Sequence, residues 1–251
     1  MALVKSEGLV VRRRDLGEAD RIVTLFTRRF GKIRAVAKGC RRPGSRLAGH
    51  LEPLNLAHFL LWKRDGRDLA LVRSAELIEP CAAVTTDFRA FAAAQAAAEL
   101  IDASLPEDEP QPRLFVLMQR FLRALKTPEH AVPALLAFSV RAAQTLGYAL
   151  TVDGCAACGT GLPAGEGRLE FRSGGLVCAP CADTSGAAGE DLTAASVRAL
   201  RAAAADPPRA TRSEDAAPAV RAVHRLLCWH QDRRLPSSER LLAESAAVAP
   251  A

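Results

Sequence analysis

Four cysteines have the residue type and the spacing that bind a metal ion. Cys155 and Cys158 form one C-x2-C pair, Cys178 and Cys181 form a second, and 19 residues separate the pairs. Each pair can present two thiolates to one ion, and two pairs complete the tetrahedral sphere that Zn²⁺ prefers. Because four cysteines leave no open position for water or substrate, the pattern predicts one structural zinc ion. One alternative is disulfides, which a reducing cytosol disfavours. The other is a chance pairing of cysteines in a chain that no longer binds metal.

The remaining residues offer little that could catalyse a reaction. Cys40, Cys81 and Cys228 are isolated in the sequence, and we expect Cys40 to be a passive small residue. The sequence has no GxxxxGK[ST] phosphate-binding loop, no GxSxG motif and no HExxH motif. These features favour a binding protein and not an enzyme.

Positive charge is concentrated in the first third of the chain. Residues 1–80 hold 17 Lys and Arg against 9 Asp and Glu, a net charge of +8, whereas residues 81–251 hold 17 against 19, a net charge of −2. Residues 21–51 contain nine cations and no acid. A field of one sign over a domain attracts a polyanion such as nucleic acid. The alternative is a solvated face whose balancing acids lie elsewhere in the chain.

Six cations of this run are candidate phosphate ligands. In "GKIRAVAK" (residues 31–38) the apolar residues alternate with cations, so a strand would direct the cations to one face. The turn-rich "AKGCRRPGSR" (residues 37–46) follows, and we expect it to continue the same basic surface. The candidates are Lys32 and Arg34 on the strand and Lys38, Arg41, Arg42 and Arg46 in the loop.

The pattern of the first eighty residues predicts β structure. Strand candidates occupy residues 9–13, 20–27, 31–38, 54–63 and 68–77, and Asp65-Gly66 is a hairpin signal between the last two. Five strands with a longer connection between the third and fourth fit an OB-type barrel, and an SH3-like barrel is the alternative. Four aromatic side chains could stack on bases, but we expect all four to pack in the core: Phe26, Phe30, Phe59 and Trp62.

After residue 80 the pattern becomes helical, so the predicted fold class is α+β. The first helix is expected over residues 85–103, with Thr85, Thr86 or Asp87 as its cap. A second is expected to begin at about residue 112 and a third to run from Pro133 to Gly147. Two more are expected over residues 192–205 and 219–234. "DPPRATRSEDAAP" (residues 206–218) is expected to be a linker. The predicted organisation is an OB-fold domain at 1–80 and a helical domain at 81–251, interrupted by the zinc module at about 151–185.

The N-terminal residues lack the apolar core of a signal peptide, and no run reaches the length of a membrane span. We therefore expect a cytoplasmic protein with no membrane partner.

Three features together resemble the RecO family of bacterial recombination mediators and DNA repair proteins. They are "GEADRIVTLFTRRFGKIRAVAKGCRRPGSR" (residues 17–46), "LEP" (residues 51–53) and the helix–zinc–helix order that follows. The resemblance covers most of the chain and weakens after Asp183. It implies an N-terminal OB-fold, a helical domain and an inserted zinc module, although some family members lack the cysteines.

The resemblance also implies a function. It implies binding of single- and double-stranded DNA, annealing of complementary strands, and cooperation with RecR to load RecA onto DNA coated by single-strand binding protein. That last protein would be recognised through the helical domain. A mediator of this kind catalyses no bond chemistry and works at the nucleoid.

Two other classes of protein remain open on the sequence. One is a zinc-ribbon RNA-binding or transcription-associated factor. ATP-independent strand annealing and RecR binding would distinguish a recombination mediator from it. The other is a zinc enzyme, which metal coordination by all four cysteines without bound water would exclude.

Overall fold

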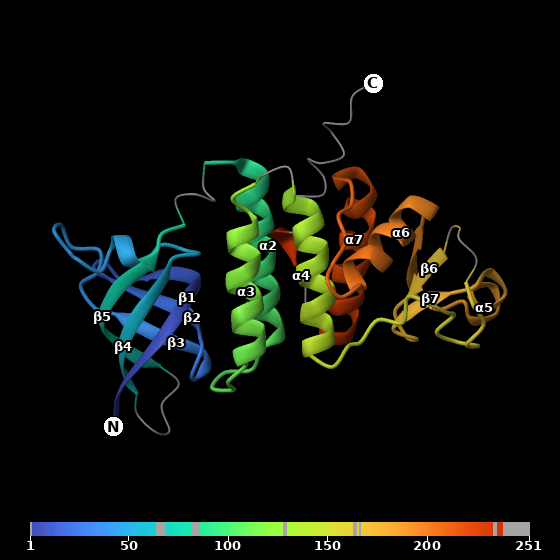
Figure 1. Cartoon of the computed structure of the whole chain (residues 1–251). Helices are drawn as coiled ribbons and strands as arrows, with labels where there is room; N and C mark the ends of the chain where they lie inside the picture. The colour runs from blue at the N-terminus through green and yellow to red at the C-terminus, as the bar shows by residue number, and fades with distance from the viewer. Residues whose placement is uncertain are drawn as a thin grey trace. The chain divides into compact units, whose positions relative to one another are not determined.

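The computed structural model describes residues 2–63, 69–81, 86–127, 130–162, 165, 167–232 and 235–237. They form two compact units (Figure 1), which are described separately. Unit 1 comprises Met1–Thr86 and Ala98–Val116, and unit 2 comprises Asp87–Ala97 and Leu117–Ala251. Helices α2 (Phe88–Ser104) and α3 (Pro112–Ala124) are therefore each divided between the units.

Unit 1 contains a closed five-stranded barrel in the order β1-β2-β3-β5-β4. Its only parallel pair among the described strands is β3 with β5, and the short helix η1 (Gly49–Leu51) lies in the connection from β3 to β4. The fold class predicted from the sequence, an OB-like sheet domain followed by helices, is confirmed. The strands are β1 (Ala2–Leu16), β2 (Asp20–Thr27), β3 (Gly31–Ala37), β4 (Leu56–Lys63) and β5 (Ala70–Glu79). The predicted Asp65-Gly66 turn lies outside the described residues.

Strand β1 is three times longer than the predicted strand at residues 9–13. Its first part pairs with β4 and its second part with β2, so one strand serves two neighbours. The register against β2 shifts between Val10 and Arg12, and Val10 and Val11 are both buried. This bulge interrupts the alternation of buried and exposed residues. An unbroken alternation would have predicted a strand longer than residues 9–13.

The barrel core confirms the alternation predicted for β3. Ile33, Ala35 and Ala37 are buried, and Cys40 packs into the same core, as expected of a passive small residue. Burial also raises the pKa of the Cys40 thiol.

Unit 1 also includes an acidic segment, residues 105–109, which lies along β3. Glu107 forms an isolated parallel bridge with Lys32, and the N–H of Asp108 donates to the Lys32 carbonyl at 2.9 Å. Gly31 has a φ of +67°, and a Cβ there would lie only 1.8 Å from the carbonyl oxygen of Glu109. The close approach of this segment therefore requires glycine at position 31.

Unit 2 is built around helices α4 (Ala131–Thr145), α6 (Ala194–Ala204) and α7 (Ser213–Gln231). Helix α2 begins with an Asp87 cap, whose carboxylate accepts from the N–H of Ala90 at 2.9 Å. The prediction of a linker through residue 218 was wrong at its C-terminal end, because α7 begins at Ser213 and contains Pro218. Glu214 and Asp215 in the first turn favour this start through the helix dipole.

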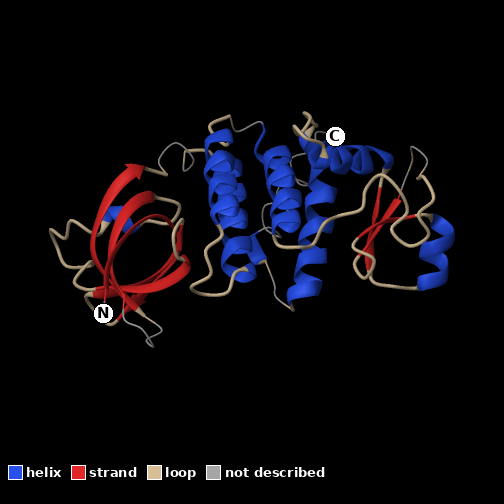
Figure 2. Cartoon of the chain, turned by 60° about the horizontal axis from the view of Figure 1, so that its bottom comes forward, coloured by secondary structure: helices blue, strands red, loops and turns tan. Residues whose placement is uncertain are grey.

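Between α4 and α6 the chain forms a small module with a three-stranded sheet in the order β7-β6-β8. Figure 2 shows the strands in red beside the short helix α5. The elements are β6 (Gly167–Glu170), β7 (Gly175–Val177), α5 (Ala179–Ser185) and β8 (Gly189–Leu192). None of the helices within the described residues is long and apolar enough to cross a membrane.

Candidate metal centre and nucleic-acid interface

The four cysteines of the two C-x2-C pairs come from two places in the small module. Cys155 and Cys158 lie in a tight loop, in which the N–H of Cys155 donates to Thr160 and the N–H of Gly159 donates back to Cys155, both at 2.8 Å. Cys178 is the N-cap of α5 and Cys181 lies in its first turn.

Strand β7 holds the two places together. The N–H of Ala156 donates to the Leu176 carbonyl at 2.8 Å, and Thr151 forms a bridge with Gly175. A Cβ on Gly175 would lie 2.5 Å from the Thr151 carbonyl oxygen, so the cysteine loop approaches β7 closely at this glycine.

The geometry of the four thiols fits a single metal ion. Their Sγ atoms all lie within 4.8 Å of one another, and the Cys158 and Cys178 sulfurs are 3.9 Å apart. Tetrahedral coordination with Zn–S bonds of about 2.3 Å places the sulfurs about 3.8 Å apart. The cluster could therefore hold a metal ion through Cys155, Cys158, Cys178 and Cys181.

The thiols differ in their tendency to ionise. Burial opposes ionisation of Cys155, but N–H groups led by that of Cys178, 3.3 Å from its sulfur, lower its pKa to about 6. A hydrogen bond with Thr160 lowers the pKa of Cys158. Hydrogen bonding to the neighbouring thiol of Cys178 raises the pKa of Cys181 to about 12. Four sulfurs this close cannot all ionise without a compensating cation, and a divalent ion would supply that charge.

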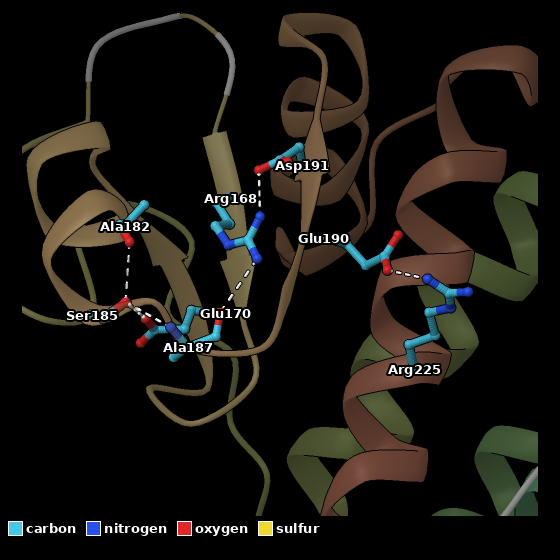
Figure 3. Close-up of polar contacts among 8 residues, drawn as sticks. All are labelled: Arg168, Glu170, Ala182, Ser185, Ala187, Glu190, Asp191 and Arg225. Atoms are coloured by element: carbon cyan, nitrogen blue, oxygen red, sulfur yellow. Dashed lines mark hydrogen bonds and ion pairs between the residues drawn. The ribbon is translucent and has the colours of Figure 1, made fainter.

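Polar contacts fix the sheet around the cluster (Figure 3). The buried carboxylate of Glu170 accepts a hydrogen bond from Ser185. It accepts another from Ser173, and the two hydrogen bonds lower its pKa. Arg168 donates to Asp191 at 2.8 Å and to the Ala187 carbonyl at 3.3 Å. A further ion pair joins Glu190 of β8 to Arg225 of α7, which ties the module to the helices of unit 2.

The structure separates the six predicted DNA-binding cations into two groups. The first group has acidic partners from outside the acid-free run. The Lys32 side chain is only 13% exposed, and its ammonium donates to the Asp102 carbonyl at 2.6 Å and lies 3.5 Å from the Asp102 carboxylate. Arg34 lies 2.5 Å from Glu107. Arg41 donates to the Gly17 carbonyl at 2.8 Å and lies 3.3 Å from Asp15.

The second group consists of Lys38, Arg42 and Arg46, which lie together in the loop. All three are exposed, and within the described residues no acid pairs with them. The loop is anchored at its start, because Asp20 accepts from the N–H of Gly39 at 2.7 Å and the N–H of Arg41 donates to the Ala19 carbonyl at 2.9 Å. Three cations are thus presented on a loop whose backbone is fixed at one end.

Sequence reasoning missed the acids that hold the first group. Asp102 and Glu107 lie about seventy residues beyond the cations that they bind. The concentration of acids in "PEDEP" (residues 106–110) next to a predicted basic domain was the available signal. The prediction that aromatic side chains pack in the core is confirmed for Phe26 and Phe59, which are fully buried, but is wrong for Trp62, which is 41% exposed.

Two family models together match most of the chain. The family model described as "Recombination protein O N terminal" matches residues 1–81, and "Recombination protein O C terminal" matches residues 85–239. The chain is 37% identical over 242 residues to "DNA repair protein RecO" of Nocardioides sp., covering 94% of this chain and 97% of that protein. It is 36% identical over 194 residues to the protein of that name from Geobacter metallireducens (77% and 79% covered) and 40% identical over 185 residues to that from Frankia casuarinae (72% and 74%). The chain therefore belongs to the RecO family, whose role is in DNA repair and recombination.

Proposed function

We propose that this chain is a non-catalytic recombination mediator that binds single- and double-stranded DNA and anneals complementary strands. The observation that supports this most directly is the set of exposed loop cations without acidic partners in the described residues, Lys38, Arg42 and Arg46. Lys and Arg bind DNA without regard to sequence by contacting phosphates and releasing condensed counterions.

The binding surface is centred on the loop and not on strand β3. Lys32 and Arg34 are engaged with Asp102 and Glu107, so DNA would have to displace those acids before reaching the strand cations. Arg41 contributes by holding the loop through Asp15 and Gly17. The six predicted residues therefore take different roles: three contact phosphates and three position or balance the surface.

Annealing follows from phosphate contact without base contact. A basic surface reduces the repulsion between two phosphate backbones while their bases remain free to pair. Because bonds are neither made nor broken, the site needs no acid, base or nucleophile.

The ion at the four-cysteine cluster is proposed to be one structural Zn²⁺. The sulfur spacing matches tetrahedral zinc, and four thiolates leave no position for water or substrate. The module has only short strands and a seven-residue helix, so metal binding would contribute much of its folding free energy.

Family membership further suggests the partners. We propose that the chain acts with RecR to load RecA onto DNA that is coated by single-strand binding protein, which is recognised through the helical region. The site of action would be the cytoplasmic nucleoid.

The test is annealing of complementary oligonucleotides precoated with single-strand binding protein, without ATP and with or without RecR. We expect the chain to accelerate duplex formation and to remain bound when RecR is added. Failure to bind bare oligonucleotides at low salt, or annealing no faster than without the protein, would overturn the proposal. Binding to RNA alone would favour the zinc-ribbon alternative.

A further inference from the structure

The outer face of the barrel carries a row of apolar side chains, two exposed and two half-buried, that the basic loop does not include. Leu3 of β1 lies opposite Trp62 of β4, and Trp62 lies opposite Leu71 of β5. Val36 of β3 lies opposite Leu71, so the row crosses four strands. Val4, Ala37 and Val72, which follow Leu3, Val36 and Leu71, pack in or against the barrel core. Because successive side chains of a strand point to opposite faces, the residues of the row point outward.

Trp62 is the centre of this row. Its side chain is 41% exposed, and that of Leu3 beside it is 60% exposed. A single exposed leucine is ordinary, but an exposed tryptophan flanked by other apolar side chains indicates a binding surface.

A β-bulge brings a cation onto the tryptophan. Leu61 lies opposite Val72 and Leu60 lies opposite Ser74, so Arg73 is the extra residue of β5. Bulges redirect side chains, and the Arg73 guanidinium carbon lies 5.6 Å from the centre of the Trp62 ring.

Two exposed cations lie beside the row, and neither pairs with an acid in the part of the chain that the structure describes. Lys5 lies in the adjacent position on β1, and like Arg73 it is exposed with no acidic partner in the described residues. On β1 and β5 the next outward-facing acids are Glu7 and Glu76, and Glu7 is paired with Arg28. On β3, Glu107 pairs with Arg34, the outward-facing residue next to Val36.

The row also adjoins the basic loop. Strand β3 contributes Val36 to the row and two residues later reaches Lys38, where the loop begins. Further along, the loop returns to β5, because His50 Nδ1 lies 2.8 Å from the carbonyl oxygen of Ala75.

We propose that the Trp62 row is a base-stacking site for single-stranded nucleic acid, whose phosphates lie against Arg73, Lys5 and the loop cations. The proposal rests on the proposed DNA-binding function and adds a second kind of contact to it. Every base offers a π-face, so an aromatic side chain beside unpaired cations binds single strands without sequence preference. A neutral apolar protein surface would cover Trp62 but would give Arg73 and Lys5 no anion, and within the described residues neither has an acidic partner.

The row distinguishes single strands from duplex. Bases in a duplex are already stacked, so Trp62 would contribute to binding of single strands alone. One tryptophan would hold few bases, which leaves the rest of the strand free to pair.

The test uses tryptophan fluorescence in the full chain, which contains two tryptophans, Trp62 and Trp229. In a Trp229→Phe variant, titration with a 20-residue oligothymidylate should quench the remaining emission in parallel with the anisotropy of the labelled oligonucleotide. Trp62→Ala should lower affinity for this single strand about tenfold, within the range of stacking contributions. Affinity for duplex, and for an abasic oligonucleotide of equal length, should not change. Trp62→Phe keeps an aromatic ring and should retain most of the affinity.

The outcomes separate this inference from the proposed function. Binding with unchanged Trp62 emission, or Trp62→Ala binding oligothymidylate like the wild type, would overturn the stacking site and leave the loop proposal standing. An equal loss for abasic and normal strands would also overturn it, because the loss would then concern phosphates. Absence of any binding by the wild-type chain would overturn both.

Discussion

Replacement of Arg42 and Arg46 by alanine tests whether the exposed loop contacts phosphates. Both side chains are exposed and have no acidic partner in the described residues, so their removal should change the melting temperature little. Each phosphate contact to a single strand contributes about −0.7 to the slope of log affinity against log salt concentration. Loss of two contacts should therefore make the slope about 1.4 less steep.

The same counterion release sets the size of the affinity change. At ~0.1 M salt, 0.7 of an ion released per contact corresponds to about a fivefold change in affinity. The double variant should bind about 25-fold more weakly. Because phosphate contacts carry no sequence information, the loss should be equal for all sequences, and the annealing rate should fall with it.

The assay is the anisotropy of a labelled oligonucleotide over a salt series. A matched control replaces Arg198 and Arg209, two exposed arginines of unit 2, by alanine, because it removes the same charge elsewhere. The reasoning is refuted if the loop variant keeps the wild-type slope and affinity. It is also refuted if the control flattens the slope equally, since net charge alone would then explain the effect. An unchanged DNA affinity with loss of RecR binding would assign the loop to a protein partner.

Three further predictions concern the scaffold. Elemental analysis should find about one zinc per chain, and serine at Cys155 and Cys158 should abolish it and lower the melting temperature. Burial lowers the pKa of His224 to about 4. As the pH falls, this imidazole therefore binds a proton near pH 6.5 in the unfolded chain but only near pH 4 in the folded chain. Stability should therefore fall between pH 6.5 and 4, by up to about 3 kcal/mol, and His224→Gln should remove this part of the pH dependence in urea unfolding. Gly31→Ala should lower the free energy of unfolding by more than about 2 kcal/mol, because its Cβ would meet the Glu109 carbonyl. The control Gly17→Ala has a similar φ but open space around it, and should lower the free energy of unfolding by about 1 kcal/mol. Equal losses would contradict the close approach at Gly31.

The four-cysteine cluster and most strands could be predicted because their signals lie within a few residues. Two C-x2-C pairs define the cluster, and the alternation in β3 defines its buried face. The helix start at Ser213 was missed because Pro218 reads as a helix breaker, while the first-turn acids are a weaker signal.

The pairing of the basic residues could not be predicted in the same way. Whether Lys32 faces solvent depends on Asp102, and this contact exists only after the chain has folded back on the barrel. Trp62 was assigned to the core by residue type, but its exposure depends on the register of β4, which places it opposite Leu3 on the outer face.

The acidic segment beside β3 has a consequence for truncated forms of the protein. A fragment that ends at residue 80 would lack Asp102 and Glu107, and would leave Lys32 and Arg34 exposed to solvent. It would also expose the Phe26 ring, whose edge-to-face partner Phe115 lies 5.4 Å away in the intact chain. Such a fragment would attract polyanions more strongly than the intact protein, and its DNA affinity would overstate the contribution of the barrel. A fragment intended to report the native surface has to continue at least through Val116, where unit 1 ends.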